Sequence, residues 1–298
     1  MMKLIDGSLI ASNIKSEIAV EVKALLEHGE AAPHLAVLIV GDDGASQTYV
    51  NSIKKSCKEV GFISSVYQFS NNAKEQEVLE AIDFLNHDPE INGYIIQLPL
   101  PKHISKEKVI ARVNADKDVD CFTPINNGKL LLGEDTFFPA TPYGTIELLK
   151  RTGIKTEGKN CVIVGRSNIV GKPLALLLAR NTPEANATVT ICHSKTKDLN
   201  KICAKADILL VAIGKAEMIT ADFVKKGAVV IDIGMHRLDA PDTEKGYRLC
   251  GDVKFDEVAA KCSYITPVPG GAGPMTMACL LLNTLKAYQQ QKAAPQNL

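Results

Sequence analysis

Apolar residues in the first hundred positions alternate between helical spacing and short continuous runs. Between Ile10 and Leu25 they recur at helical spacing, and Gly29 follows where such a helix would stop. The run LAVLIVG at 35–41 is apolar throughout and ends in glycine, as a buried strand of a parallel sheet does. The alternation continues with a helix expected at 49–60, a strand at 64–69, a helix at 74–86 and a strand at 93–99. The pattern predicts an α/β sheet domain.

The regular pattern stops between residues 114 and 144. This stretch contains DKDVDCFTPINNG and FFPATPYG, which are rich in turn-forming residues. A loop of this length is uncommon in a compact domain, and long loops more often serve a function than connect elements. We therefore expect an unstructured, functional loop here.

The second half of the chain repeats the strand–helix alternation. Strands are expected at 160–165, 187–192, 207–214 and 228–234, separated by helix-length segments, as in a doubly wound nucleotide-binding domain. A last helix, at 274–290, is expected to return to the first domain. The sequence thus predicts two α/β domains: one at 1–140 completed by 275–298, and a Rossmann-type domain at 141–274.

Composition narrows the classes of function. The 298 residues carry 34 Lys and Arg against 34 Asp and Glu, so no basic field exists to hold nucleic acid or an anionic membrane. The absence of Trp and the 5% aromatic content also argue against stacking of nucleotide bases. The eight cysteines are scattered without metal-ligand spacing, and no signal sequence or membrane span is evident. We expect a soluble, cytoplasmic enzyme acting on small molecules, with reduced thiols and no metal.

A glycine-containing turn, VIVGRSNIVGKP, leads from the first expected strand of the second domain into a helix. Gly165, Ser167 and Gly171 could direct helix-start amides at a phosphate, although the middle glycine of the GxGxxG pattern is missing. The same turn could simply pack a helix on a sheet, and the two interpretations are about equally supported by this motif alone.

The end of the following strand carries hydrogen-bond donors. A protein selecting NAD would place Asp or Glu there, whereas this chain has His193, Ser194 and Lys195, with Arg166 in the preceding turn. Donors suit a 2′-phosphate, so the sequence favours NADP over NAD. The alternative is a polar, exposed strand end without a ligand.

Four segments together resemble one known family. They are GYIIQLPLP, DKDVDCF, VGRSNIVGKP and ITPVPGGAGPMT. Three further segments, SQTYV, AVVIDIG and GDVKF, also match, and all seven occur along the chain in the order found in the family. The combination is similar to the methylenetetrahydrofolate dehydrogenase/cyclohydrolase (FolD) family over essentially the whole chain. The resemblance implies NADP-dependent oxidation of 5,10-methylenetetrahydrofolate and hydrolysis of the 5,10-methenyl product to 10-formyltetrahydrofolate. It also implies a folate-binding catalytic domain, a cleft between the domains, a homodimer and a part in purine biosynthesis.

The resemblance assigns folate-site residues by position. Tyr49 matches the active-site tyrosine, Gln97 an amide that assists at the one-carbon bridge, and Asp120 the aspartate that anchors the pterin. A carboxylate can accept two hydrogen bonds from the amino-pyrimidinone edge of a pterin. From spacing alone, Tyr49 could be a core tyrosine and Gln97 a capping amide, whereas Asp116 and Asp118 are interpreted as turn residues. Further folate contacts are expected from Leu98, Pro99, Pro269 and Gly270.

The resemblance places the cofactor on the second domain. The residues implied are Gly165, Arg166, Ser167, Ile169, Val170, His193, Ser194, Ile233, Gly234 and Gly271.

The chain departs from the family pattern at two informative positions. Where the family has lysine, four residues after the tyrosine, this chain has Ile53. Lys54 and Lys55 are rotated by about 100° and 200° on a helix, so neither occupies that direction. Since this lysine is the expected acid/base group of hydrolysis, we expect oxidation to persist and hydrolysis to be weak or lost. Cys121 replaces a family glycine, and a side chain there would shift the Asp120 loop if the backbone needs positive φ.

The sequence is compatible with four functions. They are a bifunctional dehydrogenase/cyclohydrolase with hydrolysis in doubt, a dehydrogenase with little or no hydrolysis, a non-catalytic folate- and nucleotide-binding protein, and an unrelated Rossmann dehydrogenase of small hydroxy acids. Ile53 separates the first two. The last leaves GYIIQLPLP and PVPGGAGPMT unexplained.

Overall fold

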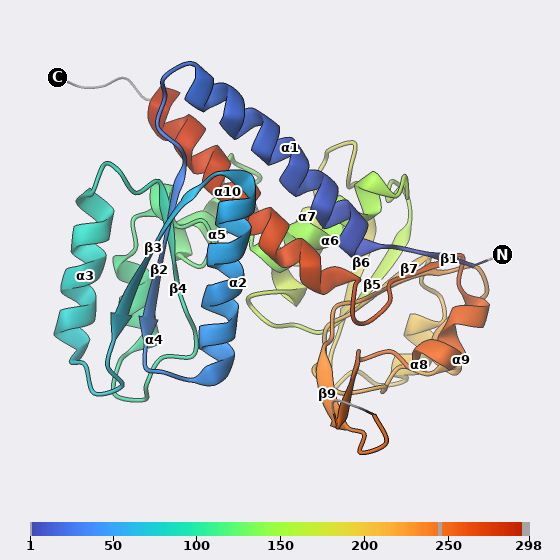
Figure 1. The fold of residues 1–298 in the computed structure, drawn as a ribbon. Coiled ribbons are helices and arrows are strands. Elements are labelled where there is room, and N and C mark those ends of the chain that lie inside the picture. Colours follow the sequence, from blue (N-terminus) through green and yellow to red (C-terminus); the bar gives the residue numbers. More distant parts are fainter. Residues whose placement is uncertain (1, 244–245, 294–298) are drawn as a thin grey trace. The chain divides into compact units, whose positions relative to one another are not determined.

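The computed structural model describes residues 2–243 and 246–293, which form two α/β units (Figure 1). The three-stranded unit comprises residues 13–139 and 277–293, and the six-stranded unit comprises residues 2–12 and 140–276. The helices α1, Gly7–Glu27, and α10, Ala272–Ala293, each begin in the six-stranded unit and continue into the three-stranded unit. The α/β fold class predicted from the sequence is confirmed.

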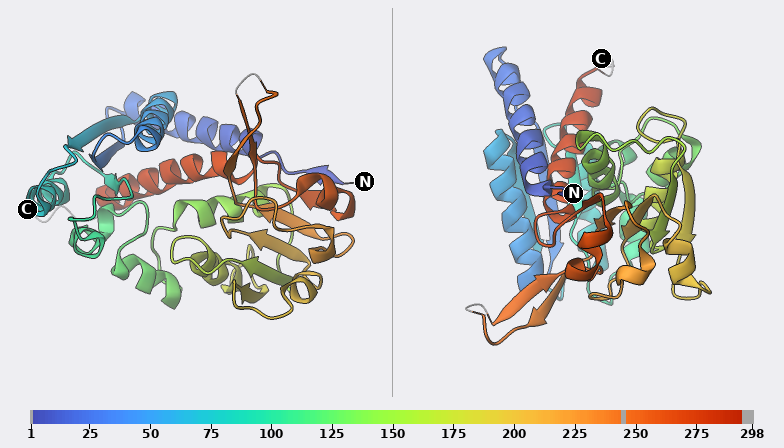
Figure 2. Two further views of the ribbon diagram at one scale, coloured as in Figure 1. Left: turned by 90° about the horizontal axis from the view of Figure 1, so that it is seen from below. Right: turned by 90° about the vertical axis from the view of Figure 1, so that its right-hand side faces the viewer.

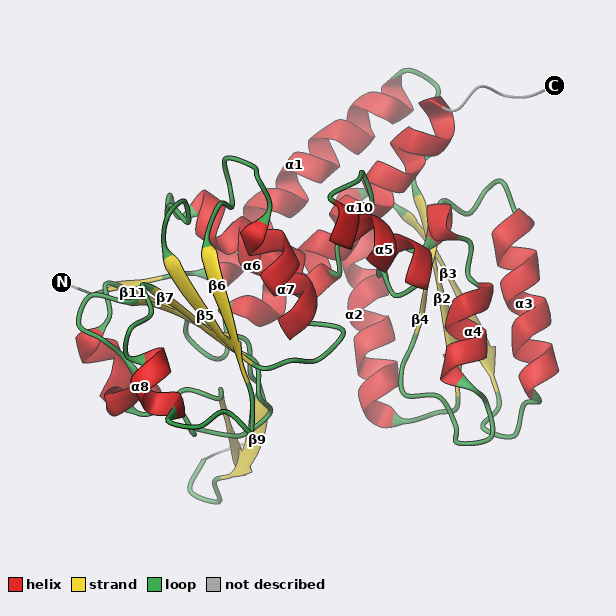
Figure 3. Cartoon of the chain, turned by 180° about the vertical axis from the view of Figure 1, so that it is seen from behind, coloured by secondary structure: helices red, strands yellow, loops and turns green. Residues whose placement is uncertain are grey.

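The three-stranded unit is built on a parallel sheet in the order β3-β2-β4. Its strands are β2 His34–Val40, β3 Ile63–Phe69 and β4 Gly93–Ile96. Ala36, Leu38 and Val40 point to one face of β2, where they pack with α3, Glu75–His87, and α4, Lys106–Arg112. The helix α2, Gly44–Val60, covers the opposite side of the sheet (Figure 3).

The helices α1 and α10 lie side by side in this unit (Figure 1). Tyr288 donates from its hydroxyl to Glu30, just beyond the end of α1, at 3.0 Å. Gln291 donates to the carbonyl of Asn92, which precedes β4, at 2.7 Å. The return of the last helix to the first domain is therefore confirmed. The helix continues to Ala293, past the expected end at residue 290.

The expectation that residues 114–144 form an unstructured loop is wrong. The segment contains a 3₁₀ turn, η1 Ala115–Lys117, the helix α5 Pro124–Leu132, and the start of α6, Ala140–Arg151. The helix α5 is defined by the residues at its two ends rather than by a repeated apolar face. The Thr123 hydroxyl accepts a hydrogen bond from the Asn126 amide, Pro124 occupies the first turn, and Gly133 ends the helix with φ 76°.

The six-stranded unit is built on a parallel sheet in the order β1-β11-β8-β7-β5-β6. Its strands are β1 Lys3–Leu4, β5 Asn160–Val164, β6 Thr188–Cys192, β7 Ile208–Val211, β8 Val229–Asp232 and β11 Tyr264–Ile265. Its remaining helices are α7 Gly171–Ala179, α8 Leu199–Cys203, α9 Phe255–Val258, and the 3₁₀ turns η2 Ala221–Phe223 and η3 Ala259–Lys261. Alternate residues of β5, Val162 and Val164, belong to the core beneath α8 and α9, and α7 packs against β5 and β6.

An antiparallel hairpin, β9 His236–Asp239 and β10 Tyr247–Cys250, projects away from this sheet (Figure 2). The Arg237 guanidinium lies 3.8 Å from the centre of the Tyr247 ring across the two strands.

The structure differs from the expected division of the chain at its N-terminus. Residues 2–12 were expected in the first domain, but they belong to the six-stranded unit because β1 pairs with β11. The Lys3 amide donates to the carbonyl of Ser263, and the Ile5 amide donates to that of Ile265, both at 2.9 Å. Among residues 2–243 and 246–293, no helix has the length and apolar character needed to cross a membrane.

Candidate functional site

Gln97 lies at the carboxyl edge of the three-stranded sheet, directly after β4. Its amide donates to the carbonyl of Leu38 on β2 at 2.8 Å, which extends the sheet contact by one residue. The side-chain amide donates to the carbonyl of Leu98 at 2.8 Å, so the Gln97 side-chain oxygen remains an available acceptor. The Leu98–Pro99 peptide is cis; Leu98 packs against the core, whereas Pro99 is exposed.

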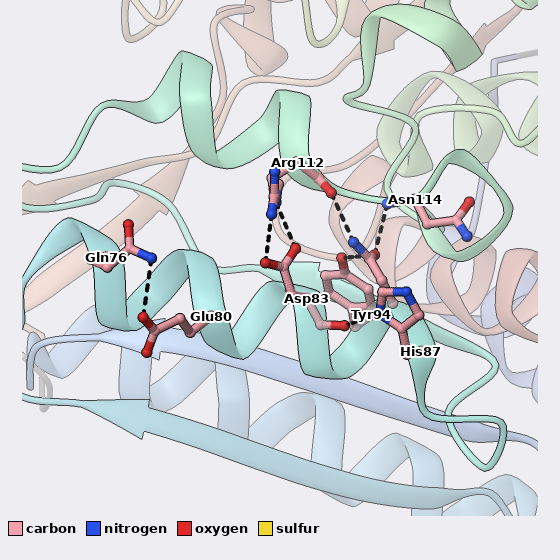
Figure 4. A network of polar contacts seen from close by, with 8 residues as sticks. Gln76, Glu80, Asp83, His87, Tyr94, Arg112 and Asn114 are labelled. Atoms are coloured by element: carbon pink, nitrogen blue, oxygen red, sulfur yellow. Dashed lines mark hydrogen bonds and ion pairs between the residues drawn. The ribbon is translucent and has the colours of Figure 1, made fainter.

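A polar network connects α3 and the end of α4 to the start of β4. The hydroxyl of Tyr94 on β4 and the amide of Asn114 both donate to the side-chain oxygen of Asn86 on α3, at 2.7 and 2.8 Å (Figure 4). Arg112 forms two hydrogen bonds of 2.6 Å with Asp83 (Figure 4). The contacts connect α3, α4, β4 and the start of the loop that carries Asp120.

Asp118 organises that loop and is not an exposed turn residue. Its carboxylate is 3% exposed and accepts hydrogen bonds from the amides of Phe122 and Thr123, at 3.0 and 2.8 Å. A third bond comes from the Asn126 side chain at 3.0 Å. Burial raises the pKa of Asp118, while these donors oppose the rise. The carboxylate thus closes the chain around Asp120 and Cys121.

Asp120 lies at the tip of this closed segment and is half-buried. It lines a small cavity together with Tyr94, Ile96 and Phe122. No hydrogen bond reaches its carboxylate from residues 2–243 or 246–293. Burial, and then the negative charge of Asp118, raise the pKa of Asp120 to about 7. The cavity, of about 10 Å³, is only about the size of one water molecule. A half-buried carboxylate that receives no hydrogen bond from the described residues is nevertheless suited to bind a ligand that donates hydrogen bonds.

Tyr49 lies close enough to Asp120 for the charge of the aspartate to affect the pKa of the phenol. Burial, and then the negative charge of Asp120, raise the pKa of the Tyr49 phenol well above its usual value. The phenol therefore stays protonated at neutral pH and can donate a hydrogen bond. Tyr49 and Asp120 therefore lie within electrostatic range of each other.

Ile53 faces the core of the unit. It lies one turn after Tyr49 on α2, on the same face as Cys57 and Val60, and is 0% exposed. Lys54 and Lys55 are exposed on other faces of the helix. The position where a lysine was expected therefore holds a fully buried aliphatic side chain.

Cys121 adopts the backbone conformation that the sequence raised as a possibility. Its φ is 58°, in the left-handed region that favours glycine, and its side chain is buried. The Cys121 amide donates to the carbonyl of Asp118, and its carbonyl accepts from the Asn127 side chain, both at 3.0 Å. The loop therefore accommodates the substitution with its hydrogen bonds in place.

In the six-stranded unit, the turn after β5 has room only for glycine at two positions. Gly165 has φ 140°, and a Cβ there would lie 2.3 Å from the carbonyl oxygen of Ala212. A Cβ at Gly171 would lie 2.2 Å from the carbonyl oxygen of Gly165. The Ser167 hydroxyl accepts from the amide of Val170 at 3.1 Å, and α7 begins at Gly171. The backbone can approach a ligand closely here.

The donors expected at a ribose phosphate lie at the ends of β5 and β6. Arg166, Ser194 and Lys195 are exposed, as are Ser167 and Ile169. The Lys195 amide donates to Nδ1 of His193 at 3.2 Å, so the proton of a neutral His193 ring lies on Nε2 and is available to a ligand. This donor set fits the 2′-phosphate of NADP.

Two buried carboxylates behind this sheet edge had no role in the sequence-based site. The Asp252 carboxylate accepts hydrogen bonds from the backbone amides of Ile213 and Lys215, at 2.7 and 2.8 Å. It also accepts one from Nε2 of His236 at 2.8 Å. The Asp232 carboxylate accepts hydrogen bonds from the backbone amides of Gly234 and Asp252, both at 3.0 Å. Burial raises the pKa of Asp232 to about 6. They fix the loops after β7 and β8.

Ile233 and Gly234 occupy the second of these loops. The Ile233 amide donates to the carbonyl of Val211 at 2.9 Å. A Cβ at Gly234 would lie 2.4 Å from the Asp252 carboxyl carbon, so glycine is required for this packing. Ile233 is thus held by the sheet, and Gly234 is held by the Asp232–Asp252 pair.

Replacing Asp252 with alanine is expected to destabilise the six-stranded unit by about 3 kcal/mol, because several buried donors lose their acceptor. Thermal unfolding, or urea unfolding of the full chain, measures the loss. Asp256→Ala, which removes an exposed carboxylate from α9, is the control. Equal stability of the two variants would contradict a structural role for Asp252.

The glycine loop before α10 also lies in the six-stranded unit. The Val268–Pro269 peptide is cis, and Gly270 has φ 102°. A Cβ at Gly271 would lie 2.5 Å from the carbonyl oxygen of Pro267, and the Ser8 amide donates to the carbonyl of Gly270 at 3.1 Å. Pro269 is exposed whereas Gly271 is buried.

Some of the residues that sequence reasoning missed carried weak signals. Asp252 lies in the GDVKF segment, and Asp232 in AVVIDIG, where an acidic residue interrupts an apolar run. Asn283 similarly interrupts the apolar stretch ACLLLNTL of α10. A polar residue inside an apolar run requires partners, but the sequence does not identify them. Within the described part of the chain, no cluster of three or more His, Cys, Asp or Glu side chains could hold a metal ion.

Comparison with known proteins identifies two matching family models. Residues 5–120 match the catalytic domain of tetrahydrofolate dehydrogenase/cyclohydrolase, and residues 139–292 match its NAD(P)-binding domain. Bifunctional protein FolD of Cytophaga hutchinsonii is 53% identical over 286 residues, covering 96% of this chain and 99% of the relative. The protein of the same name from Porphyromonas gingivalis is 52% identical, covering 96% of each chain.

Solved structures agree with these matches. FolD methylenetetrahydrofolate dehydrogenase/cyclohydrolase of Campylobacter jejuni has a TM-score of 0.91 and 46% identity, over 97% of this chain and 99% of that chain. The Trypanosoma brucei enzyme, complexed with NADP and an inhibitor, has a TM-score of 0.91 and 35% identity, over 98% and 99%. The chain therefore belongs to the tetrahydrofolate dehydrogenase/cyclohydrolase family, the enzymes of one-carbon folate metabolism that its sequence motifs resemble.

Proposed function

We propose that this chain oxidises 5,10-methylenetetrahydrofolate to 5,10-methenyltetrahydrofolate with NADP, and that it hydrolyses the methenyl compound only slowly. The observation that carries the first part is the half-buried Asp120 carboxylate, which receives no hydrogen bond from the described residues and lies within electrostatic range of Tyr49. Membership of the dehydrogenase/cyclohydrolase family supports the same chemistry.

The folate would bind in the three-stranded unit. The Asp120 carboxylate would accept hydrogen bonds from the amino-pyrimidinone edge of the pterin, and Gln97 would contact the one-carbon bridge with its side-chain amide. The protonated Tyr49 phenol would donate a hydrogen bond to the bound folate. Leu98 and Pro99 would supply apolar contact beside Gln97, while Pro269 and Gly270 are the proposed folate residues of the other unit.

NADP would bind in the six-stranded unit, and when bound it accepts the hydride that leaves the methylene carbon. Gly165, Ser167 and Gly171 would admit the pyrophosphate to the start of α7. Arg166, His193 and Ser194 would contact the 2′-phosphate, with Ile169 and Val170 beside them. Ile233, Gly234 and Gly271 are the remaining proposed contacts.

Slow hydrolysis follows from Ile53. Water must lose a proton as it adds to the methenyl carbon, and an amine near Tyr49 would assist that transfer. The buried aliphatic side chain of Ile53 cannot carry a proton. Oxidation needs no such group, because alignment of the two reactants supplies most of the catalysis.

The function is tested by mixing the protein with 5,10-methylenetetrahydrofolate and NADP and recording the absorbance of NADPH. Formation of NADPH supports the proposal. Binding of both ligands without turnover would instead identify a binding protein. Turnover of small hydroxy acids, with none of the folate, would identify an unrelated dehydrogenase.

The cofactor preference gives a separate prediction. We expect Arg166→Ala to raise KM for NADP about tenfold and to leave KM for NAD within about twofold, because only NADP carries the 2′-phosphate. Lys159→Ala is the control, since it removes an exposed cation just before the other end of β5. Equal effects of Arg166→Ala on both cofactors would contradict the assignment.

The wider role proposed for the chain is that of a cytoplasmic homodimer supplying formyl groups for purine biosynthesis, without nucleic-acid or membrane partners. The equal numbers of acidic and basic residues support the absence of a polyanion partner. Sedimentation of the full chain tests the dimer, and a monomer at micromolar concentration would contradict it.

A further inference from the structure

Asn283 is a buried polar residue in the otherwise apolar middle of α10. Its side chain is 2% exposed, and its neighbours on the helix, Leu280 and Leu281, are fully buried. The side-chain nitrogen donates two hydrogen bonds of 2.7 Å, one to the carbonyl of Val119 and one to that of Phe138. Placing an amide here is costly unless both bonds are made, so the side chain has one preferred orientation.

Val119 is restrained from two directions. Its carbonyl accepts the bond from Asn283, and its side chain packs against Gly93, where a Cβ would lie only 2.3 Å from Val119 Cγ1. The residue is 0% exposed. The backbone that enters Asp120 is thus held both through its oxygen and through its side chain.

The backbone that leaves Asp120 is restrained by Asp118. The Asp118 carboxylate binds the amides of Phe122 and Thr123, and its carbonyl accepts from the amide of Cys121. The carboxylate of Asp120 itself receives no hydrogen bond from the residues that the structure describes. Its direction is therefore set by the main chain on either side. The Asp118 carboxylate binds the residues that follow Asp120, and Asn283 binds the carbonyl of the residue before it.

We propose that Asn283 is a positioning residue of the folate site, which fixes Val119 so that the adjacent Asp120 carboxylate is presented to the pterin in one direction. This inference rests on the proposed function of Asp120. Asn283 does not touch the ligand, and it acts by restricting the motion of the segment that carries its acceptor.

The test is Asn283→Leu, which keeps the approximate volume and removes both donors. We expect KM for 5,10-methylenetetrahydrofolate to rise at least tenfold, kcat to change less than about threefold, and Kd for NADP to stay unchanged. Tyr288→Phe is the control: it removes a hydrogen bond between α10 and Glu30 without contact to Val119. Asn283→Ser, which retains one donor on a shorter side chain, should give an intermediate KM and serves if the leucine variant does not fold.

A double-mutant cycle with Asp120→Asn separates positioning from general loss of structure. If Asn283 acts through Asp120, Asn283→Leu raises KM in the wild type but adds little in the Asp120→Asn background. An unchanged KM in a folded Asn283 variant, or full additivity of the two substitutions, would overturn the proposal. Failure of the proposed function is distinguishable, because the wild-type protein would then form no NADPH at all.

Discussion

We expect replacement of Asp120 with asparagine to lower kcat/KM for 5,10-methylenetetrahydrofolate by about 100- to 1000-fold. The carboxylate is expected to accept two hydrogen bonds from the pterin, and each bond to a charged group contributes about 1.5–3 kcal/mol. Asparagine keeps the shape of the side chain but has only one oxygen that can accept a hydrogen bond. Its NH₂ group would face an N–H donor of the pterin. Steady-state kinetics with varied folate measures the change.

The control for this substitution is Asp116→Asn, which neutralises an exposed carboxylate at the start of the same loop. Its kcat/KM should stay within about twofold of the wild type. Comparable losses in both variants would show that charge in the loop, rather than the Asp120 carboxylate, matters.

The pH dependence of folate binding follows from the same residue. The pKa of Asp120 is raised to about 7, so the carboxylate form that binds the pterin predominates above pH 7 and is lost as the pH falls through 7. We expect KM for the folate to rise between pH 8 and pH 6 by about tenfold. A KM that is flat over this range would contradict the assignment.

Stability of the ligand-free protein should change in the opposite sense. An aspartate with a raised pKa binds its proton more tightly in the folded state, so its contribution to stability is present below about pH 4 and is lost as the pH rises to about 7. Asp120→Asn removes this cost. The variant should therefore be more stable than the wild type at pH 8 by about 1–2 kcal/mol, a discounted figure because Asp120 is only half-buried. At pH 4 the difference should vanish.

The second large effect is a gain of hydrolysis on replacing Ile53 with lysine. We expect Ile53→Lys to accelerate decay of the methenyl compound at least tenfold, since it places an amine one helical turn from Tyr49. Oxidation should change by less than about threefold. The absorbance of the methenyl compound, followed with and without protein, measures the rate.

Controls for Ile53 exploit its burial. Ile53→Met keeps an aliphatic side chain of similar size and should leave hydrolysis slow, whereas Lys54→Met tests whether the exposed lysine reaches the site. A charged amine at a fully buried position costs several kcal/mol, so the lysine variant is assayed well below its unfolding temperature. Rapid hydrolysis by the wild type that Lys54→Met abolishes would assign the reaction to Lys54.

The sequence was most informative where its apolar period was long. The strands β2 to β8 follow short apolar runs and the helices α1, α2, α3 and α10 follow helical spacing, and these elements were predicted in order. The two-residue strands β1 and β11 were not predicted, because two residues are too few to show a pattern. The helix α5 was missed because it depends on Thr123, Pro124 and Gly133 at its ends rather than on a repeated apolar face. Capping residues and loop residues are the same residue types, and only the backbone distinguishes them.

Only part of the candidate site could be predicted from the sequence. The strand end at Gln97 and the glycine turn at Gly165 could be located because sheet edges and tight turns have local sequence signals. The restraints on Asp120 could not, because Asn283 lies 164 positions from Val119 in the sequence. Hydrogen bonds between such distant residues depend on the tertiary fold.

The balance between the two reactions is tested most directly by one time course. The wild-type protein is mixed with NADP and 5,10-methylenetetrahydrofolate, and the absorbances of NADPH and of the methenyl compound are recorded together. We predict that both absorbances rise, and that the methenyl compound then decays at nearly its protein-free rate. Formation of NADPH with methenyl decay tens of times faster than in buffer, or the absence of any NADPH, would contradict it.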